Sequence, residues 1–590
     1  MAKLILGPVL SYRGGGADGA WRVSALIGVE DNTGALALHL GGRAVKPPVL
    51  LLQQGGRSYF RYDLSCKQGQ EERRVDYRLE GVDGQWSFTV PGKGQAPRMA
   101  YVSCNGFSDP SGIRKLIRAE NAVWEDLLCN HDSTVRPPGY ELDKEQLWHE
   151  ARTHDKGRQR FHLLLMGGDQ IYFDSIWEDL KELKGWIGLP RDEQLVYPVS
   201  AALDKKIEAY YLQLYSARWL PAERHAWGAQ DPTLDAALAM ASMPTVMMWD
   251  DHDIFDGWGS YSAEMQRSPL FQRLFHHARK AFWVFQMQHA VELLPELTHR
   301  SDIRVRSNDP LFEPIDWKQV LKPDKLALPL LDQQPGFSFV HALGPLQLVV
   351  ADLRTERSHE QVLGPETWRA LQGSLGAIPG QDASASACQH LLFMSSVPVV
   401  HPKLSLAEAF MDGFGSDHVL DSSADDLKDH WTNDDHEGER KRLIETLLKT
   451  ARDKRLRVSI LSGDVHVAAW GTAYRSDVEP QDNWAQIQQF TSTAVVHPSL
   501  VSVTERLFFH VLNAVARSRQ ALDVNLKAEM MLFPGSNRYV LAARNWLALE
   551  LDAPGGHAGG AKLWTTWRCE TKSAFTNHLL ATEPASTQTG

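Results

Sequence analysis

The stretch Thr245–Asp253, with the sequence TVMMWDDHD, decides the fold class of this chain. Thr245–Trp249 is an apolar run of strand length, and four ionisable side chains follow it directly at Asp250–Asp253. Crowded carboxylates repel one another, so they must take up protons or bind cations. A loop of fully solvated charges is the alternative, but the apolar residues that follow, such as Phe255 and Trp258, disfavour it. The stretch therefore predicts a buried strand that ends in a metal-binding segment.

Five other apolar runs also end in polar or metal-competent residues, and helical patterns such as those near Phe271–Phe285 and Leu443–Ala451 lie between the runs. This alternation is typical of an α/β fold. Ligands of open α/β sheets bind beyond the carboxyl ends of the strands, so six such endings predict one shared site. The five runs, each with the residues that follow it, are Met99–Ser103 (Cys104, Asn105), Phe161–Met166 (Gly168, Asp169), Leu346–Ala351 (Asp352, Arg354), Leu391–Met394 (Ser395, Ser396) and Val458–Leu461 (Asp464, His466).

The chain divides into segments of different character. Its 590 residues exceed what one hydrophobic core usually serves, so we expect a large catalytic domain and at least one smaller unit. Residues 1–95 carry short apolar runs separated by turns and predict a small β-sandwich. Residues 96–500 form the predicted catalytic domain, residues 501–578 contain two strand-like runs that could pack on it, and residues 579–590 read as a disordered tail.

Composition excludes several classes of protein. A net charge of −11 disfavours a surface that coats nucleic acid. No stretch reaches the roughly 20 apolar residues that span a bilayer. The segment Met1–Gly14 reads as a first strand and not as a signal peptide, and the five cysteines are odd in number and scattered. We therefore expect a protein without a membrane span that works in a reducing cytoplasm.

The segment Gly168–Tyr172 follows one of the strands and offers two metal ligands. The glycine allows a sharp turn, and the Asp169 carboxylate, with two oxygens, can bridge two cations. Tyr172 can reach the same point, and its phenolate would suit a trivalent cation such as Fe(III). The alternative is a simple turn in which Asp169 caps the next helix.

Three further strand ends supply candidate ligands or charges. Asp464 and His466 lie two residues apart, so in an extended segment they share a face and can ligate together. Cys104 offers a thiolate for a transition metal or is a buried unreactive cysteine. Arg354 either clamps a phosphate or forms a structural ion pair with Asp352. His252 offers a neutral nitrogen ligand or a general acid near neutral pH.

At these residues the sequence resembles the PhoD-like alkaline phosphatase group within the calcineurin-like metallophosphatase superfamily. The matching segments, in chain order over residues 97–500, are Ser103–Asn105, Gly168–Tyr172, Trp249–Asp253, Asp352–Arg354 and Ser462–His466. The resemblance implies a four-layer α/β sandwich, hydrolysis of phosphomonoesters or phosphodiesters, and iron held partly by Cys104 and Tyr172. It also implies divalent cations beside the iron, calcium first, with manganese, zinc or magnesium as substitutes. One departure is Asp256, which stands where the family usually has asparagine and changes the charge near one metal.

The sequence thus predicts a phosphoesterase in which a metal-bound hydroxide attacks the phosphoester at a dinuclear or multinuclear site. The predicted metal ligands are Cys104, Asp169, Tyr172, Asp250, Asp464 and His466, with Asp251 as a further candidate. The predicted catalytic residues are His252 as rim acid or base, Asp251, and Arg354 for orienting the phosphate. A metal-containing binding or regulatory protein with little turnover is the alternative function. A serine nucleophile is disfavoured because the chain lacks a Gly-x-Ser-x-Gly elbow.

Overall fold

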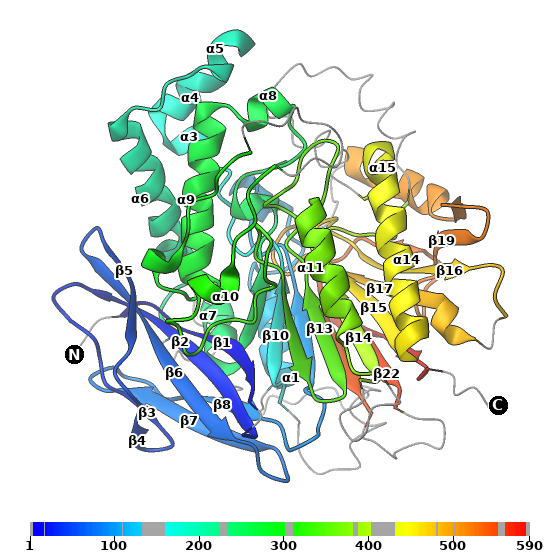
Figure 1. The fold of residues 1–590 in the computed structure, drawn as a ribbon, viewed down its shortest axis with the longest axis horizontal. Helices are drawn as coiled ribbons and strands as arrows, with labels where there is room; N and C mark the ends of the chain where they lie inside the picture. Colours follow the sequence, from blue (N-terminus) through cyan, green and yellow to red (C-terminus); the bar gives the residue numbers. More distant parts are fainter. Residues whose placement is uncertain are drawn as a thin grey trace.

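The computed structural model describes residues 4–16, 18–108, 110–131, 160–222, 234–300, 311–380, 388–402, 431–479, 482–498, 503–552 and 561–585. Within these ranges the strands gather in two large sheets and one small sheet, with helices packed around them (Figure 1). The mixed α/β class predicted from the sequence is confirmed. All six predicted strands that end in polar residues are present, as β9, β10, β11, β13, β14 and β15.

The larger sheet has ten strands and combines the N-terminal, central and C-terminal parts of the chain. Its neighbouring strands β9, β10 and β11 are parallel, so the residues that follow them lie at one edge of the sheet. The strands in order across the sheet are β23 (Phe575–Thr582), β22 (Leu563–Glu570), β21 (Asn545–Leu551), β9 (Met99–Val102), β10 (Leu163–Gly167), β11 (Thr245–Met248), β1 (Leu4–Gly15), β2 (Ala20–Glu30), β6 (Arg57–Lys67) and β5 (Val49–Gln54).

The N-terminal region is β-rich, as predicted, and its main strands belong to a sheet that continues into the central part of the chain. β1 pairs in parallel with β11, with Ser11 opposite Thr245, so the ten-stranded sheet crosses the boundary predicted at residue 95. The reason lies in burial, because nearly every residue of β1 is buried on both faces, which is typical of a strand inside a sheet. A separate small sheet holds β4 (Arg43–Ala44), β3 (Leu38–Leu40), β7 (Arg73–Leu79) and β8 (Trp86–Val90).

The second large sheet has nine strands and carries the other three predicted strand ends. Its central strands β13, β14, β15 and β17 are parallel. The order is β12 (Phe339–Leu343), β13 (Leu346–Val350), β14 (His390–Met394), β15 (Arg457–Ser462), β17 (Gln486–Ser492), β16 (Ala468–Arg475), β19 (Leu526–Met530) and β18 (Gln520–Ala521), with β20 (Val540–Leu541) paired to β16.

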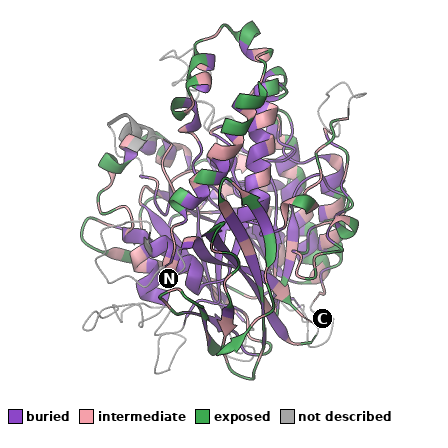
Figure 2. Cartoon of the chain, turned by 90° about the vertical axis from the view of Figure 1, so that its left-hand side faces the viewer, coloured by how far each residue is buried: buried purple, intermediate pink, exposed green. Residues whose placement is uncertain are grey.

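Helices cover the outer sides of the sheets. α14 contacts β15 and β17 and α11 packs beside it, while α6 and α7 contact β1 of the other sheet. Figure 1 shows α11 and α14 in front of β13–β17, and Figure 2 shows buried strands inside and helices with an exposed side outside. The described α-helices are α1 (Ala122–His131), α3 (Ile176–Asp179), α4 (Lys181–Ile187), α5 (Arg191–Leu195), α6 (Ala201–Arg218), α7 (Leu234–Ser242), α8 (Ala263–Gln266), α9 (Pro269–Phe285), α10 (Trp317–Val320), α11 (Pro365–Gly376), α14 (Glu437–Lys454) and α15 (Val503–Val515).

The helix α9 shows how the sequence sets an element that lies near the sheet. The Ser268 hydroxyl accepts from the backbone N–H of Phe271, and Pro269 occupies the first turn, where its missing N–H costs nothing. The apolar residues predicted at three-to-four spacing form the buried side of the helix. Among the helices in the described ranges, none combines the length and the apolar character needed to cross a bilayer.

The C-terminal segment completes the larger sheet. β21 pairs antiparallel with β9, the strand that leads to Cys104. The two strands predicted near residues 539–542 and 547–551 are present as β20 and β21. β23 pairs with β22 as far as Thr582, so the chain stays ordered into the segment that reads as a disordered tail, whereas residues 586–590 lie outside the described ranges.

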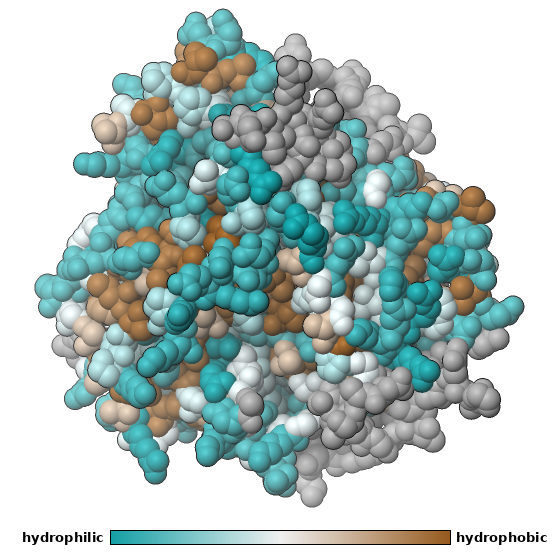
Figure 3. All heavy atoms as spheres, in the orientation of Figure 1, coloured by the Kyte–Doolittle hydropathy of each residue, from teal (hydrophilic) through white to brown (hydrophobic). Residues whose placement is uncertain are grey.

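On the face shown in Figure 3 the surface is mostly hydrophilic, with groups of hydrophobic residues between, the largest at the left of the view. The edge strand β5 exposes Val49 and Leu50, which are 39% and 41% exposed.

Candidate metal centre

The carboxyl ends of parallel strands from both large sheets meet at one place. Asp250, which follows β11, is contacted by Arg354, which follows β13, and accepts a hydrogen bond of 2.9 Å from the Ser396 hydroxyl, which follows β14. The Cys104 thiol, after β9, lies 3.8 Å from the backbone oxygen of Asp464, after β15. The strand ends predicted to share a site therefore converge, but they come from two different sheets.

Four carboxylates form the centre of this region. Asp169, Asp250, Asp251 and Asp464 each offer an oxygen, and these oxygens all lie within 4.8 Å of one another. A second group shares two of these residues, since Asp169, Asp251 and His252 also bring ligand atoms within 4.8 Å. Burial, reinforced by Asp250, Asp251 and Asp253, raises the pKa of Asp169 well above its usual range. Hard cations prefer such clustered carboxylate oxygens.

Several of the predicted ligands have an unusual backbone conformation. Cys104, Asp169, Asp464 and His466 have φ values of 56°, 56°, 71° and 52°, in the left-handed region that side chains other than glycine rarely adopt. Gly168 has a φ of 118°, and a Cβ at this position would lie 2.7 Å from the Cβ of Asp250. Backbone strain of this kind persists only where the surrounding structure imposes it, and it concentrates at functional sites.

Cys104 and Tyr172 lie beside Asp169, as the sequence predicts for a shared site. The Cys104 thiol is 3.3 Å from Asp169 Oδ2, and the Thr493 hydroxyl donates to the sulfur over 2.8 Å. Burial and the neighbouring Asp169 raise the pKa of the Cys104 thiol, and burial and Cys104 raise the pKa of the Tyr172 phenol. Asp169 Oδ1 is buried and has no hydrogen-bond partner among the described residues, so these donors fit a cation that would supply the missing contact.

Arg354 is fully buried and binds the two aspartates that follow β11. Its guanidinium donates from Nε to Asp250 Oδ1, from Nη2 to Asp251 Oδ1 at 3.1 Å, and from Nη1 to the backbone oxygen of Trp258 at 3.0 Å. The side chain of Asp352 is engaged elsewhere, accepting from the Trp249 indole at 2.8 Å. The predicted alternative of an Arg354–Asp352 ion pair is therefore wrong, because the charge of Arg354 compensates Asp250 and Asp251 instead.

His252 forms a dyad with a residue that the sequence did not single out. Its Nδ1 lies 2.9 Å from Asp174 Oδ2, and Asp174 Oδ1 accepts from the backbone N–H of Asp256 at 2.7 Å. Burial lowers the pKa of His252, but the carboxylates of Asp174, Asp251, Asp256 and Asp169 outweigh it and raise that pKa well above the usual range. Asp256, the residue that departs from the family pattern, therefore lies beside the histidine as a further negative charge.

Asp253 has a structural role, although it belongs to the same acidic run as Asp250 and Asp251. Its carboxylate accepts from the backbone N–H groups of Gln170, Ile171 and Asp250 and from the Gln286 amide, over 2.9–3.2 Å. Burial raises the pKa of Asp253 to about 7 despite these donors. This carboxylate ties the loop of Asp169 to the loop of Asp250 and so sets the spacing of the cluster.

His466 lies at the side of the cluster, in a row of rings. It stacks on His497 with ring centres 3.7 Å apart, His497 stacks on Tyr172 at 5.9 Å, and Tyr172 stacks on His252 at 4.2 Å. Burial and the nearby His252 lower the pKa of His466 to about 3, so its ring is neutral and can offer a nitrogen.

Sequence reasoning missed His497, Thr493 and Asp174. The first two follow β17, a seventh parallel strand end, whose sequence QIQQFTS has too few apolar residues to read as a buried run. The Gln489 side chain nevertheless lies inside, where it accepts from the backbone N–H groups of Val399 and Val400 at 2.8 Å each. Asp174 could have been identified as a candidate from its position in the sequence, two residues after Tyr172.

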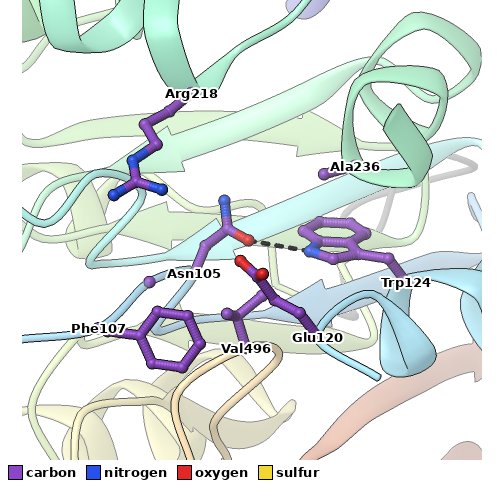
Figure 4. A pocket seen from close by; sticks show the side chains of 8 residues that line it. Asn105, Phe107, Glu120, Trp124, Arg218, Ala236 and Val496 are labelled. Atoms are coloured by element: carbon purple, nitrogen blue, oxygen red, sulfur yellow. Dashed lines mark hydrogen bonds between the residues drawn. The ribbon is translucent and has the colours of Figure 1, made fainter. Parts of the chain in front are cut away.

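A small hollow of about 30 Å³ is lined by Asn105 and Gly106, the two residues that follow Cys104 in the chain, and by Glu120 (Figure 4). Its walls include Phe107, Trp124 and Val496, and the Trp124 indole donates to Asn105 Oδ1 at 2.9 Å. Arg218, at the C-terminal end of α6, points into the hollow and brings a positive charge to it.

Comparison with known proteins gives two findings. The family described as "PhoD related phosphatase" matches residues 142–308, 330–419 and 410–531. An uncharacterized protein of Saccharomyces cerevisiae, YGR266W, is 25% identical over 447 residues, which cover 70% of this chain. The chain spans 56% of the length of that yeast protein. The matched family segments contain every predicted site residue except Cys104, which lies before the first of them.

Proposed function

Because this chain belongs to the PhoD related phosphatases, we propose that it hydrolyses phosphomonoesters or phosphodiesters at the carboxylate cluster described above. The observation that carries the proposal is the convergence of Asp169, Asp250, Asp251 and Asp464 within 4.8 Å, at strand ends inside the matched segments. We also propose that the two large sheets and their covering helices make the four-layer sandwich that the family resemblance implies.

The proposal assigns the metal ligands to the predicted residues. Cys104, Asp169 and Tyr172 would hold a cation such as Fe(III) on one side, and Asp250, Asp464 and His466, with Asp251, would hold one or more divalent cations, calcium first. When bound, such cations would polarise the phosphoryl oxygens and lower the pKa of a coordinated water to near neutral pH. Asp169 and Asp251 both belong to the two groups whose ligand atoms lie within 4.8 Å of one another. Asp169 also lies 3.3 Å from the Cys104 thiol, so its two carboxylate oxygens would suit a bridging role between the two sides.

His252 is the proposed acid that protonates the leaving oxygen. Its Nδ1–H donates to Asp174, which leaves Nε2 as the nitrogen for proton transfer to substrate. The surrounding carboxylates, Asp174 first, raise the pKa of this ring, which favours the protonated form that an acid in this position requires. Asp174 is the proposed positioning residue, since it fixes both the tautomer and the direction of the ring.

Arg354 is proposed to act on the phosphate through the aspartates that it holds. Three of its donors already contact Asp250, Asp251 and the Trp258 backbone, so a direct phosphate clamp would have to break these bonds. All five cysteines are buried and none forms a disulfide within the described residues, which fits the proposed reducing cytoplasm.

The test is an elemental analysis of the purified protein, combined with phosphoester turnover, for the wild type and Asp169→Asn. We expect the variant to lose bound metal and activity together, while its unfolding midpoint stays within a few degrees of the wild type. Asp477→Asn is the matched control, because Asp477 is a surface carboxylate paired with Arg475 at 2.6 Å and lies outside the cluster. Full activity in Asp169→Asn would contradict the assignment.

The same measurement separates the second candidate function. Stoichiometric metal that Asp169→Asn removes, without turnover of any phosphomonoester or phosphodiester tested, would favour a metal-containing binding or regulatory protein. An absorption band that disappears in Tyr172→Phe would further assign a trivalent iron to the tyrosine side of the centre.

A further inference from the structure

His497 lies inside the candidate metal centre, yet neither the predicted ligand set nor the proposed mechanism uses it. Its ring stacks with the rings of two predicted ligands, Tyr172 at 5.9 Å and His466 at 3.7 Å between ring centres. The ring planes are inclined by only 20° and 13°, so the three rings are close to parallel.

The backbone around His497 is tied to the same strand end as Cys104. The N–H groups of Val496 and His497 both donate to the Cys104 carbonyl at 3.2 Å, and Val495 donates to the Ser103 carbonyl at 2.9 Å. Residues 493–497 thus wrap around the predicted thiolate ligand, and the Thr493 hydroxyl donates to its sulfur at 2.8 Å. The position of the His497 ring is therefore fixed relative to Cys104.

The imidazole itself is fixed as well. His497 Nδ1 lies 3.1 Å from the Pro498 carbonyl, which can only accept, so Nδ1 carries the proton and the ring cannot rotate freely. A side chain whose backbone, Nδ1 and ring are all in contact with neighbours is held in one orientation. His466, by contrast, has no hydrogen bond from its ring to another described residue, so the stack is its main restraint.

The stacking geometry argues against a shared cation. A metal bound to an imidazole nitrogen lies close to the plane of that ring, about 2.0–2.1 Å from the nitrogen. Because the planes of His466 and His497 are nearly parallel and their centres are 3.7 Å apart, a cation in the plane of one ring lies well off the plane of the other. His497 is therefore placed to orient His466 and not to ligate beside it.

We propose that His497 is a positioning residue that fixes the ring plane of His466 by stacking, so that His466 meets the cation in the correct direction. This inference rests on the proposed metal centre. It assigns the role to the flat ring and not to the nitrogen, and it predicts that a phenylalanine can replace the histidine. Mutation of a residue that orients a metal ligand typically weakens metal binding by about 10–100-fold.

The experiment titrates metal-free protein with Mn²⁺ alone and measures the dissociation constant by calorimetry, for the wild type, His497→Phe and His497→Leu. We expect His497→Phe to bind Mn²⁺ within about threefold of the wild type and His497→Leu to bind about 10–100-fold more weakly. The unfolding midpoint of each metal-free variant is recorded alongside, so that a folding defect is seen directly. Equal weakening in both variants would assign the role to the nitrogen, and no weakening in either would remove the role, so each result would overturn the proposal.

A double-mutant cycle tests whether His497 acts through His466. In the His466→Ala background, His497→Leu should change the Mn²⁺ dissociation constant by less than about twofold. The same loss with and without His466 would show that His497 acts independently and would overturn the proposal.

His578→Leu is the matched control. The Nδ1 of His578 also donates to a proline carbonyl, that of Pro534 at 2.7 Å, and its half-buried ring packs 5.0 Å from Phe533, outside the centre. This variant should keep the wild-type Mn²⁺ affinity. A wild-type protein that binds no Mn²⁺ and no other cation would overturn the proposed metal centre, a result distinct from a wild type that binds Mn²⁺ and tolerates His497→Leu.

Discussion

Arg354 places one permanent positive charge among four carboxylates. With Asp250 and Asp251 it forms a buried ion network in which all three side chains are at most 3% exposed. Such networks are costly to break, because the group that remains is a buried charge without compensation. The arginine therefore reduces the net negative charge of the cluster, which a bound cation would otherwise have to balance alone.

The first prediction concerns Arg354→Gln in the metal-free protein. Removing the guanidinium should lower the free energy of unfolding by about 3–5 kcal/mol, because Asp250 and Asp251 lose their partner. Saturating Mn²⁺ should raise the unfolding midpoint of this variant more than that of the wild type, since the cation replaces the lost charge. Thermal unfolding with and without Mn²⁺ measures both effects.

Arg544→Gln provides the comparison for this prediction. Arg544 and Glu570 form an equally buried pair, each 1% exposed, outside the cluster. The same substitution there should also destabilise the protein, but Mn²⁺ should restore none of the loss beyond its effect on the wild type. An equal response of the two variants to Mn²⁺ would contradict the proposed role of Arg354.

At the level of single residues, the meeting of the carboxylates could be predicted from the sequence, whereas the hydrogen bonds that hold their loops in place could not. Asp169, Asp250 and Asp464 each follow a recognisable apolar run, so their meeting could be predicted. The separate place of Asp253 could not, because its partners Gln170 and Ile171 lie in a different loop far along the chain. Hydrogen bonds of this kind depend on tertiary structure and leave no local pattern.

At the level of elements, the loop after β13 and the start of α11 are joined by one buried acid. The Glu356 carboxylate accepts from the Thr367 hydroxyl in the first turn of α11, and a Cβ at Gly364 would collide with Glu356 Oε1. Burial is the largest influence and raises the pKa of Glu356 to about 7. The folded protein therefore binds this proton more tightly than the unfolded chain, in which the ordinary value is 4.5.

The second prediction is a pH dependence of stability from Glu356. Its contribution is complete below pH 4.5 and is lost as the pH rises towards 7, with a total of about 3 kcal/mol. Glu356→Gln keeps the shape without the titration, so its stability relative to the wild type should increase by about 2 kcal/mol between pH 5 and pH 8. Urea unfolding of both proteins at the two pH values measures this difference.

The control for the pH experiment is Glu264→Gln, an exposed glutamate on α8. Its stability difference from the wild type should be the same at both pH values. If Glu356→Gln behaved in the same way, the buried acid would not be linked to folding.

The elements themselves were largely predictable, and their partners were not. Apolar runs identified all six functional strands and the helices α9 and α14 from local spacing. The assignment of these strands to two sheets depends on pairing between distant segments, such as Ser11 with Thr245 and Tyr101 with Leu547. Local periodicity does not encode such register, and for that reason the N-terminal strands read as a separate sandwich.

At the level of the whole molecule, one sheet runs through segments that the sequence divides. The ten-stranded sheet takes strands from residues 4–67, 99–248 and 545–582. The Thr245 hydroxyl on β11 also donates to the Leu10 carbonyl on β1 at 2.7 Å, so the N-terminal strands share a buried bond with a strand that carries the candidate site. A shared sheet favours cooperative unfolding.

The third prediction is therefore a single unfolding transition. Scanning calorimetry and tryptophan fluorescence should give the same unfolding midpoint. Thr245→Val should lower the free energy of unfolding of this single transition by about 1 kcal/mol, the usual contribution of one hydrogen bond. A separate transition that Thr245→Val leaves in place would show instead that the N-terminal region unfolds as an independent domain.

The convergence of strand ends from two sheets has a consequence for biosynthesis. On the ribosome, the Cys104 and Asp169 segments emerge long before Asp464, and β21, the partner of β9, emerges later still. The four-carboxylate cluster therefore does not exist in any nascent chain that ends before β15, whatever its earlier parts have folded into. The proposed loading with a cation would therefore require synthesis at least as far as Asp464, and a chain that ends before β15 would carry the earlier acidic motifs without the site.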